Sequence, residues 1–382
     1  MKLLHLADLH IGKKVNGFSM IEDQQEILRQ VCNIIDEKKT DGVLIAGDVY
    51  DKAIPPAEGV ALFDWFLTEL SKRKQKIFIV SGNHDSSERI SFASGIMKEE
   101  GVYISKPFHG ELERIVVEDP ESKVHIYLLP FIRPAHVKAY FPEAEIEDYT
   151  DAVDTVIKNT SLDPQAVNIL MAHQFVVNRG QLPMQSDSES ISVGSLDHVE
   201  ASCFAPFDYV ALGHLHHPQK VGRKSIRYAG SPLKYSFSEA GKGKKKSVPL
   251  LTIDENGVDC ETISLDPIRD LRIIRGPIDH LLSEEVHQNE GLDDYMLVVL
   301  TDEDEPVDPL GKIRSVYPNT MKIEFDNKRS KQNQSEKTAK EVAKKSSYEL
   351  FEEFYFAMNN VAMSEEEKSF VQKILEEVEE KA

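Results

Sequence analysis

Five short polar clusters in the first 216 residues carry the side-chain types that bind metal ions. They contain carboxylate, imidazole and amide groups but no thiol. The clusters are Asp8-Leu9-His10, Gly47-Asp48, Gly82-Asn83-His84-Asp85, His173 and Gly213-His214-Leu215-His216. Without a thiolate, a structural zinc site is disfavoured, whereas oxygen and nitrogen donors suit a catalytic divalent cation. The sequence therefore predicts a metal-dependent enzyme.

The clusters offer seven candidate ligands, which is too many for one tetrahedral ion. They are Asp8, His10, Asp48, Asn83, His173, His214 and His216. Residues two apart in an extended segment point to the same side, so each Asp-x-His or His-x-His pair can reach one centre. Seven donors suit two ions ~3.5–4 Å apart that share a carboxylate, and such a pair activates water and orients a phosphodiester for in-line displacement. Asp48 is the expected bridge, because it has no candidate partner two residues away.

His84 follows a candidate ligand but is predicted to have a different role. As a cation it would either stabilise the equatorial phosphoryl oxygens or protonate the leaving oxygen. Asp85 is expected either to orient His84 or to cap a helix. Taken singly, each polar residue has a structural explanation, such as a cap, a core histidine or a turn. Their convergence is what favours a site.

The elements that position these residues are short apolar runs typical of buried strands. Such runs precede all five clusters, at 3–7, 42–46, 77–81, 167–172 and 209–212. In sheets of this kind ligands gather beyond the carboxyl ends of the strands. Helical patterns at 20–38 and 57–72, and a third with Ile90, Phe92, Ile96 and Met97, alternate with the first strands, which predicts a layered α/β fold. The helix at 57–72 is apolar over more than one face, which indicates either deep burial or an oligomer contact.

Composition and charge restrict the class of protein. The chain has 382 residues and a formal net charge of −20, which argues against nucleic acid binding over the whole surface but permits a local basic groove. No stretch is long and apolar enough to span a membrane, and no secretory signal is recognised at the start. The three cysteines lie far apart and suit a reducing compartment, so a cytoplasmic location is expected. The basic loop at 241–246 is either a solvated turn or a phosphate contact.

The pattern predicts four parts of the chain. They are a catalytic domain at 1–266, a small α/β domain at 267–326, a basic linker at 327–346 and a helical hairpin at 347–382. Within the first part, the polar stretch 178–195 is expected to be a mobile loop that borders the site. The linker holds seven Lys or Arg against two Glu. The hairpin is too small to bury its own apolar residues, so it is expected to dock on the body of the chain or, preferably, on a partner.

The order D-x-H, G-D, G-N-H-[DE], H and G-H-x-H resembles the calcineurin-like metallophosphoesterase family. The resemblance implies an α/β fold, a two-sheet sandwich flanked by helices, with a small capping domain and a C-terminal helical hairpin. It also implies the metal assignment. Asp8, His10, Asp48 and His216 would hold one ion, and Asp48, Asn83, His173 and His214 would hold the other.

Residues 1–12, 45–51, 79–85, 209–216 and 228–232 are more closely similar to the DNA-nuclease branch of that family. This resemblance implies a manganese-dependent exonuclease on double-stranded ends and endonuclease on hairpins and single strands, acting with an ABC-type ATPase in DNA repair, recombination and replication. It implies a homodimer through helices at 57–72 and 87–98, within a heterotetramer. It further implies that the helical hairpin grips the coiled coil of the ATPase, through Phe351, Phe354, Tyr355, Met358, Phe370 and Ile374.

Two other functions are compatible with the same clusters. One is a phosphoesterase for phosphoproteins or small nucleotides, which would have little use for the small domain at 267–326 or for an apolar helical hairpin. The other is a non-enzymatic scaffold, which would have no chemical reason to retain seven ligands at strand ends. The nuclease is therefore the favoured prediction.

Overall fold

The computed structural model describes residues 1–118, 123–189, 197–241, 245–287, 291–304 and 306–327. Towards the C-terminus it describes residues 351–352, 355, 363–364, 367–368 and 370–371. Residues 328–346 of the predicted linker and most of the predicted hairpin, including Phe354, Met358 and Ile374, lie outside the described residues. No described helix is long and apolar enough to cross a membrane.

Two six-stranded mixed sheets form the body of the described part of the chain. The first has the order β16-β15-β1-β4-β5-β6, in which β1, β4, β5 and β6 run parallel and β15 runs antiparallel to both β1 and β16. Its strands are β1 (Lys2–Leu6), β4 (Gly42–Ala46), β5 (Lys76–Val80), β6 (Val102–Ile104), β15 (Lys246–Asp254) and β16 (Gly257–Leu265).

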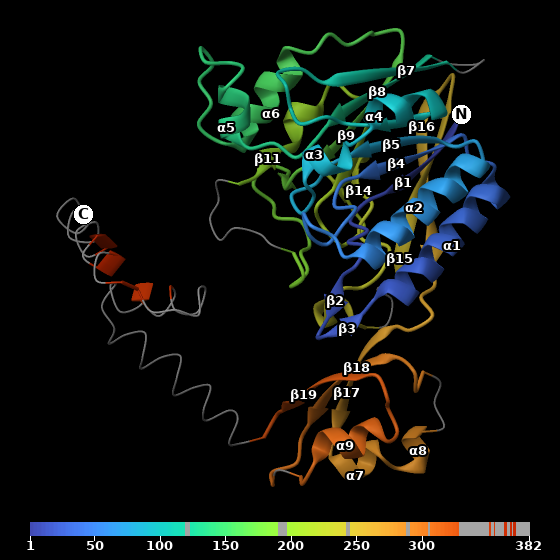
Figure 1. The fold of residues 1–382 in the computed structure, drawn as a ribbon, viewed down its shortest axis with the longest axis vertical. Helices are drawn as coiled ribbons and strands as arrows, with labels where there is room; N and C mark the ends of the chain where they lie inside the picture. Colours follow the sequence, from blue (N-terminus) through green and yellow to red (C-terminus); the bar gives the residue numbers. More distant parts are fainter. Residues whose placement is uncertain are drawn as a thin grey trace. The chain divides into compact units, whose positions relative to one another are not determined.

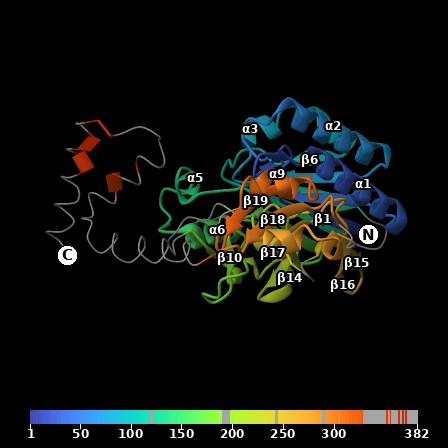
Figure 2. The ribbon, with the colours of Figure 1, turned by 90° about the horizontal axis from the view of Figure 1, so that it is seen from below.

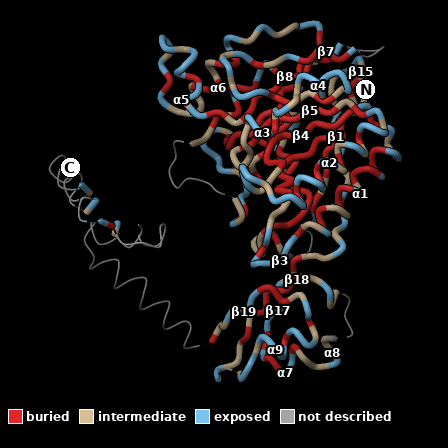
Figure 3. The backbone as a smooth tube through the Cα atoms, in the orientation of Figure 1, coloured by how far each residue is buried: buried red, intermediate tan, exposed pale blue. Residues whose placement is uncertain are grey.

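The second sheet has the order β13-β14-β12-β9-β8-β7. Its strands are β7 (Glu113–Glu118), β8 (Lys123–Leu129), β9 (Val167–His173), β12 (Tyr209–Gly213), β13 (Gln219–Val221) and β14 (Arg223–Tyr228). Strands β8, β9, β12 and β14 are parallel. Figure 3 shows that the buried residues gather in the central strands of the body.

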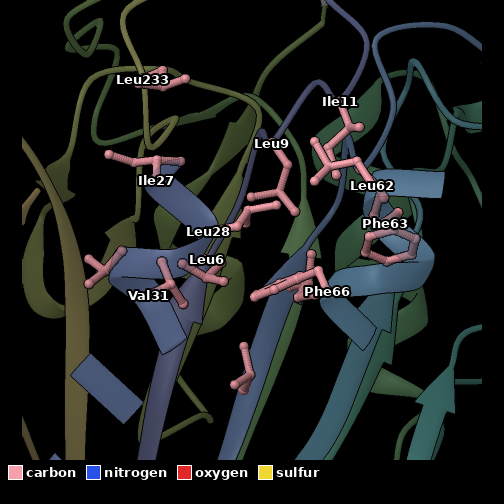
Figure 4. Packing of buried hydrophobic residues seen from close by; sticks show 14 of the residues in the cluster. Leu6, Leu9, Ile11, Ile27, Leu28, Val31, Leu62, Phe63, Phe66 and Leu233 are labelled. Atoms are coloured by element: carbon pink, nitrogen blue, oxygen red, sulfur yellow. The ribbon is translucent and has the colours of Figure 1, made fainter. Parts of the chain in front are cut away.

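Helices α1 (Ile21–Lys38) and α2 (Ala57–Lys72) cover the outer face of the first sheet (Figures 1 and 2). Alternation along β1 explains the layers, because successive side chains of a strand point to opposite faces. Leu4 and Leu6 pack in the cluster under the two helices, while Leu3 belongs to the cluster between the two sheets. Figure 4 shows Leu6 among helix residues that include Leu28 and Phe66.

The second sheet is covered on its other face by α5 (Pro134–Lys138) and α6 (Tyr149–Lys158), as Figure 1 shows. Val153 and Val156 of α6 pack with Leu170 of β9 in a third apolar cluster. The body therefore has four layers in the order helix, sheet, sheet, helix. The predicted α/β fold with two facing sheets is confirmed.

The third predicted helix differs from the expectation. It forms two short helices, α3 (Ser87–Ile90) and α4 (Ser94–Met97), separated by a left-handed residue, Ala93, at φ 59°. Phe92 is 80% exposed and Ile96 is 76% exposed, so neither belongs to the core. Val60 of α2 is 45% exposed, although its helical spacing is that of a core residue.

A three-stranded sheet with the order β17-β18-β19 lies in the region of the predicted capping domain. Its strands are β17 (Leu271–Gly276), β18 (Tyr295–Leu300) and β19 (Thr320–Phe325), and the helices nearby in sequence are α7 (Ile278–Leu281), α8 (Glu284–His287) and α9 (Pro309–Arg314). The remaining short elements are β2 (Lys14–Val15), β3 (Phe18–Ser19), β10 (Val176–Val177), β11 (Val199–Glu200), and the 3-10 turns η1 (Lys98–Glu100), η2 (Ala201–Phe204) and η3 (Phe237–Glu239). The boundaries of the four predicted parts stay a prediction.

Candidate metal centre

The polar clusters lie at the carboxyl ends of parallel strands from both sheets. Strand β1 leads to Asp8, β4 to Asp48 and β5 to Asn83, whereas β9 ends at His173 and β12 ends just before His214. In the second sheet Gly213 pairs directly with His173, so the last two clusters are neighbours across the ladder. The two facing sheets thus bring all seven candidate ligands to one rim.

Asp48 lies between two groups of donors. Its Oδ2 is 3.6 Å from His10 Nε2 on one side and 3.3 Å from His173 Nε2 on the other. Nε2 of His10 is in turn 3.0 Å from Nε2 of His216. On the opposite side, Asn83 Oδ1 lies 3.1 Å from His173 Nε2 and 3.0 Å from His214 Nδ1. These distances place His10 and His216 on one side of Asp48 and a second group on the other, and the assignment of the ligands to two ions stays a prediction.

The buried donors fit divalent cations. Asp8 is fully buried, and its Oδ2 is among the described side-chain atoms that have no hydrogen-bond partner. Asp8, His10 and His216 offer ligand atoms that all lie within 4.8 Å of one another, as do Asp8, Asp48 and His173. A buried carboxylate oxygen without a partner is costly, and a cation beside it would remove that cost.

Burial also sets the protonation of the imidazoles. It lowers the pKa of His10 and of His214 to about 3, which keeps both rings neutral and their lone pairs available to a metal. Burial opposes protonation of His173 as well, but the charge and hydrogen bond of Asp48, together with the charge of Asp8 and the Ala46 carbonyl, raise the pKa of His173 to about 9. A cation bound beside Asp48 would therefore take the place of a proton on His173.

Four of the candidate ligands have a left-handed backbone conformation. The φ angles are 53° at Asp8, 44° at His10, 50° at Asp48 and 108° at His214. Such conformations are unfavourable for residues with a Cβ atom and cluster at functional sites, where the surroundings hold them in place. All four residues lie just after the ends of strands β1, β4 and β12.

Outer partners orient the histidine rings. Nδ1 of His173 is 2.8 Å from the carbonyl oxygen of Ala46, so that nitrogen is the donor and Nε2 is left for the centre. His84 has the same arrangement, because its Nδ1 lies 2.9 Å from the carbonyl oxygen of Asp51. The centroids of the His84 and His10 rings are 4.9 Å apart. The backbone N–H of His84 donates a hydrogen bond to Asp48 Oδ1 at 2.9 Å, which fixes the loop that carries His84.

Asp85 performs neither of the roles that the sequence left open. Its carboxylate accepts hydrogen bonds from the backbone N–H groups of Val49, Tyr50 and Gly82, at 3.0–3.2 Å, and the ring of His84 is held instead by Asp51. Burial, followed by the charge of Asp48, raises the pKa of Asp85 to about 6. Asp85 therefore ties the loop after β4 to the loop after β5 and is a positioning residue.

Four residues at the rim were not singled out from the sequence. Ser188 and Glu189 lie in the described part of the predicted bordering loop, and both hydrogen-bond to His216. Lys246 ends the basic run predicted as a solvated turn or a phosphate contact; residues 242–244 of that run lie outside the described residues, and Lys246 itself is not solvated. It is buried in an ion pair with Glu239. The only indication of these four residues in the sequence was the position of the polar loop, which follows His173 and was expected to border the site.

The fold and these buried donors define a metal-dependent phosphoesterase. The profile of the calcineurin-like phosphoesterase family matches residues 1–218, and that of a family described as the type 5 capsule protein repressor C-terminal domain, SbcD_C, matches residues 267–359. The chain is 32% identical over 385 aligned residues to the SbcD subunit of the nuclease SbcCD of Staphylococcus epidermidis, with 98% of each chain covered. It therefore belongs to the SbcD family of calcineurin-like phosphoesterases.

Two solved structures are also similar to the chain. A dimetal phosphatase from Danio rerio aligns with a TM-score of 0.40 and 10% identity, over 70% of this chain and 99% of that chain. The phosphoesterase YfcE from E. coli aligns with a TM-score of 0.28 and 13% identity, over 70% of this chain and 100% of that chain.

Proposed function

We propose that this chain is the nuclease subunit of an SbcCD-type complex and that it hydrolyses DNA phosphodiesters with two divalent ions. Manganese is the metal that we expect. The observation that carries the proposal is the convergence of seven candidate metal ligands at one buried rim, with His84 beside them. The relative from Staphylococcus epidermidis, which matches along nearly the whole chain, is named as a nuclease subunit and supports the choice of substrate.

In this proposal the side chains divide between two ions. Asp8, His10, Asp48 and His216 hold one, and Asp48, Asn83, His173 and His214 hold the other. When bound, the two ions supply an activated water and neutralise the charge of the phosphodiester. Asp48 links the two groups, since it lies within 3.6 Å of both His10 and His173.

His84 is the proposed catalytic acid or transition-state stabiliser. Nδ1 of His84 forms a hydrogen bond with the carbonyl oxygen of Asp51, and this bond fixes the orientation of the ring. In the imidazolium form Nε2 also carries a hydrogen, which it can donate to a phosphoryl oxygen or transfer to the leaving oxygen. His84 is close enough to His10 and Asp48 to share a centre with them, so a phosphate held there lies within its reach.

The proposed partners are DNA and an SbcC-type ABC ATPase. The substrates are double-stranded ends, hairpins and single strands, and the biological context is DNA repair, recombination and replication in the cytoplasm. The helical hairpin would grip the coiled coil of the ATPase. Of its proposed contact residues, Phe351 and Phe370 are exposed and Tyr355 is half-buried, whereas Phe354, Met358 and Ile374 lie outside the described residues. The catalytic chain would form a homodimer within a heterotetramer.

The alternative is a phosphoesterase for small nucleotides or phosphoproteins that uses the same centre. The match of residues 267–359 to the SbcD_C family favours the nuclease, because that match covers the part of the chain beyond the catalytic domain. The two functions are separated by their substrates, which permits a direct test.

The test is cleavage of end-labelled duplex and hairpin DNA by the purified chain with manganese or with chelator. His84→Ala is compared with His109→Ala, a histidine outside the candidate site. We expect manganese-dependent cutting that His84→Ala reduces by about 10²–10⁴-fold with unchanged manganese affinity, and that His109→Ala leaves intact. Hydrolysis of an aryl phosphodiester with DNA left uncut, even after addition of the ATPase, would support the alternative instead.

A further inference from the structure

The backbone of His216 is held from several sides by residues of other elements. Its N–H donates to Glu189 Oε1 at 2.6 Å, and its carbonyl oxygen accepts from Lys246 Nζ at 2.7 Å. The backbone N–H of Ser231 donates to the same carbonyl oxygen at 3.2 Å. Of the contacts described above for the candidate ligands, only those of His216 come from the loop that follows His173.

A chain of polar groups then reaches the ring of His216. Nδ1 of His216 is 2.7 Å from Ser188 Oγ. Ser188 Oγ lies 3.4 Å from Glu239 Oε1 and 2.9 Å from Ser186 Oγ, and Ser186 Oγ donates to the same Glu239 oxygen at 3.0 Å. Glu239 is buried and forms an ion pair with buried Lys246. We call Lys246, Glu239, Ser188 and His216 the rim relay.

The charge of Glu239 favours one direction for the hydrogen bonds of Ser188, whose single hydrogen could otherwise go to His216 Nδ1. An ionised carboxylate only accepts, so the hydroxyl groups next to Glu239 direct their hydrogens towards it. Ser188 donates to Glu239 or to Ser186, and in both cases its lone pair is left for the ring of His216. Nδ1 of His216 is then the protonated nitrogen. Nε2 carries the free lone pair and faces Nε2 of His10 at 3.0 Å.

We propose that Ser188 is a positioning residue of the metal centre: through the rim relay it sets the tautomer and the ring orientation of His216, so that Nε2 is presented to the cation. This proposal rests on the proposed metal-dependent function. It makes the loop that follows His173 a part of the centre, because the loop supplies the group that prepares one ligand.

The loop is anchored by bonds that do not involve Ser188 Oγ. Gln219 Nε2 donates to the carbonyl oxygen of Met184 at 2.7 Å, and Met184 N donates to Gln219 Oε1 at 2.9 Å. Ser186 N donates to Glu189 Oε2 at 3.0 Å. Removal of the Ser188 hydroxyl therefore breaks the relay to the ring and leaves these anchors in place.

The experiment compares the purified full-length chain with its Ser188→Ala and Ser188→Thr variants by calorimetric titration with manganese. Ser161→Ala, at an exposed serine after α6, is the matched control. Loss of an outer partner of a metal-bound histidine typically weakens metal binding 10–100-fold. We expect Ser188→Ala to weaken the binding of one ion by about 10–100-fold and to leave the other ion at its parental affinity. Ser188→Thr keeps the hydroxyl, and we expect this variant to bind that ion with the parental affinity.

Two results would overturn the relay while leaving the function intact. One is a Ser188→Ala variant that binds both ions as tightly as the parent and the Ser161→Ala control. The other is a Ser188→Thr variant as weak as Ser188→Ala, which would show that the hydroxyl is not the group that matters. A parent chain that binds no manganese would overturn the metal centre itself, and with it the relay, so the two failures are distinguishable.

Discussion

At the scale of residues, the centre depends on side chains that could be identified from the sequence and on close approaches that could not. The seven donors were predictable, because each follows an apolar run whose carboxyl end marks the rim. Ser188 and Lys246 were not, because a serine in a polar loop and a lysine in a basic run normally face solvent. Lys246 begins β15, a strand that pairs with β1 from far away in the sequence, and its Nζ donates to the carbonyl oxygen of His216.

Two motif glycines lie where a side chain would displace the centre. A Cβ atom on Gly82 would be 2.1 Å from Asp48 Oδ1, and one on Gly213 would be 1.9 Å from the carbonyl oxygen of Ala46. Both distances are far below van der Waals contact. The glycines before Asn83 and His214 are therefore required by packing against the neighbouring cluster.

We predict that Gly82→Ala pushes the Asp48 carboxylate out of place. The unfolding free energy should fall by about 1–3 kcal/mol, the typical cost of overpacking, and manganese affinity should fall with it. The measurements are denaturant unfolding and manganese titration. Gly95→Ala is the control, because a Cβ atom there meets nothing within 4 Å. Equal stability and equal metal affinity in the two variants would contradict the prediction.

At the scale of elements, local pattern predicted the parallel strands and the two long helices. The strand at Gly42–Ala46 is apolar throughout and buried throughout, so its environment can be read from its composition. The pairing of the β15–β16 hairpin with β1, which is made by β15, was not predicted, since a hairpin carries no local mark of the strand it will join. The break at Ala93 was missed for a similar reason: the apolar spacing of Ile90, Phe92 and Ile96 continues across it.

The exposed residues Phe92 and Ile96 belong to the predicted dimer surface. Large apolar side chains at 80% and 76% exposure favour a contact that covers them. We predict that the parent chain elutes at twice the chain mass of 43.2 kDa and that Phe92→Asp with Ile96→Asp reduces it to the mass of one chain.

Size-exclusion chromatography with light scattering gives these masses. Val116→Asp is the matched control, because Val116 of β7 is 47% exposed and lies on a different element. A parent chain that is monomeric at micromolar concentration, or a double variant that stays dimeric, would contradict the predicted surface.

At the scale of the whole molecule, the charge of −20 has to be reconciled with the proposed DNA substrate. Phosphate contacts supply most of the affinity of a protein for DNA, and an acidic chain provides few of them. Bound divalent ions offset part of the charge at the centre. We therefore infer that the proposed ATPase partner contributes much of the basic surface that binds DNA.

This inference predicts that the isolated chain binds duplex DNA more weakly than the complex with its ATPase, and that the binding of the complex falls more steeply with salt. Fluorescence anisotropy with labelled duplex, over a series of salt concentrations, measures both quantities. Calcium in place of manganese would limit cleavage during the titration. Equal affinity of the isolated chain and the complex at matched salt would show that the chain supplies its own DNA surface.

The most direct test of the central claim is anomalous diffraction at the manganese edge from crystals of the chain grown with manganese. The account predicts two peaks at the rim, ~3.5–4 Å apart. Asp48 would lie between them, with His10 and His216 around one and His173 and His214 around the other. A single peak, or ions bound away from these side chains, would contradict it.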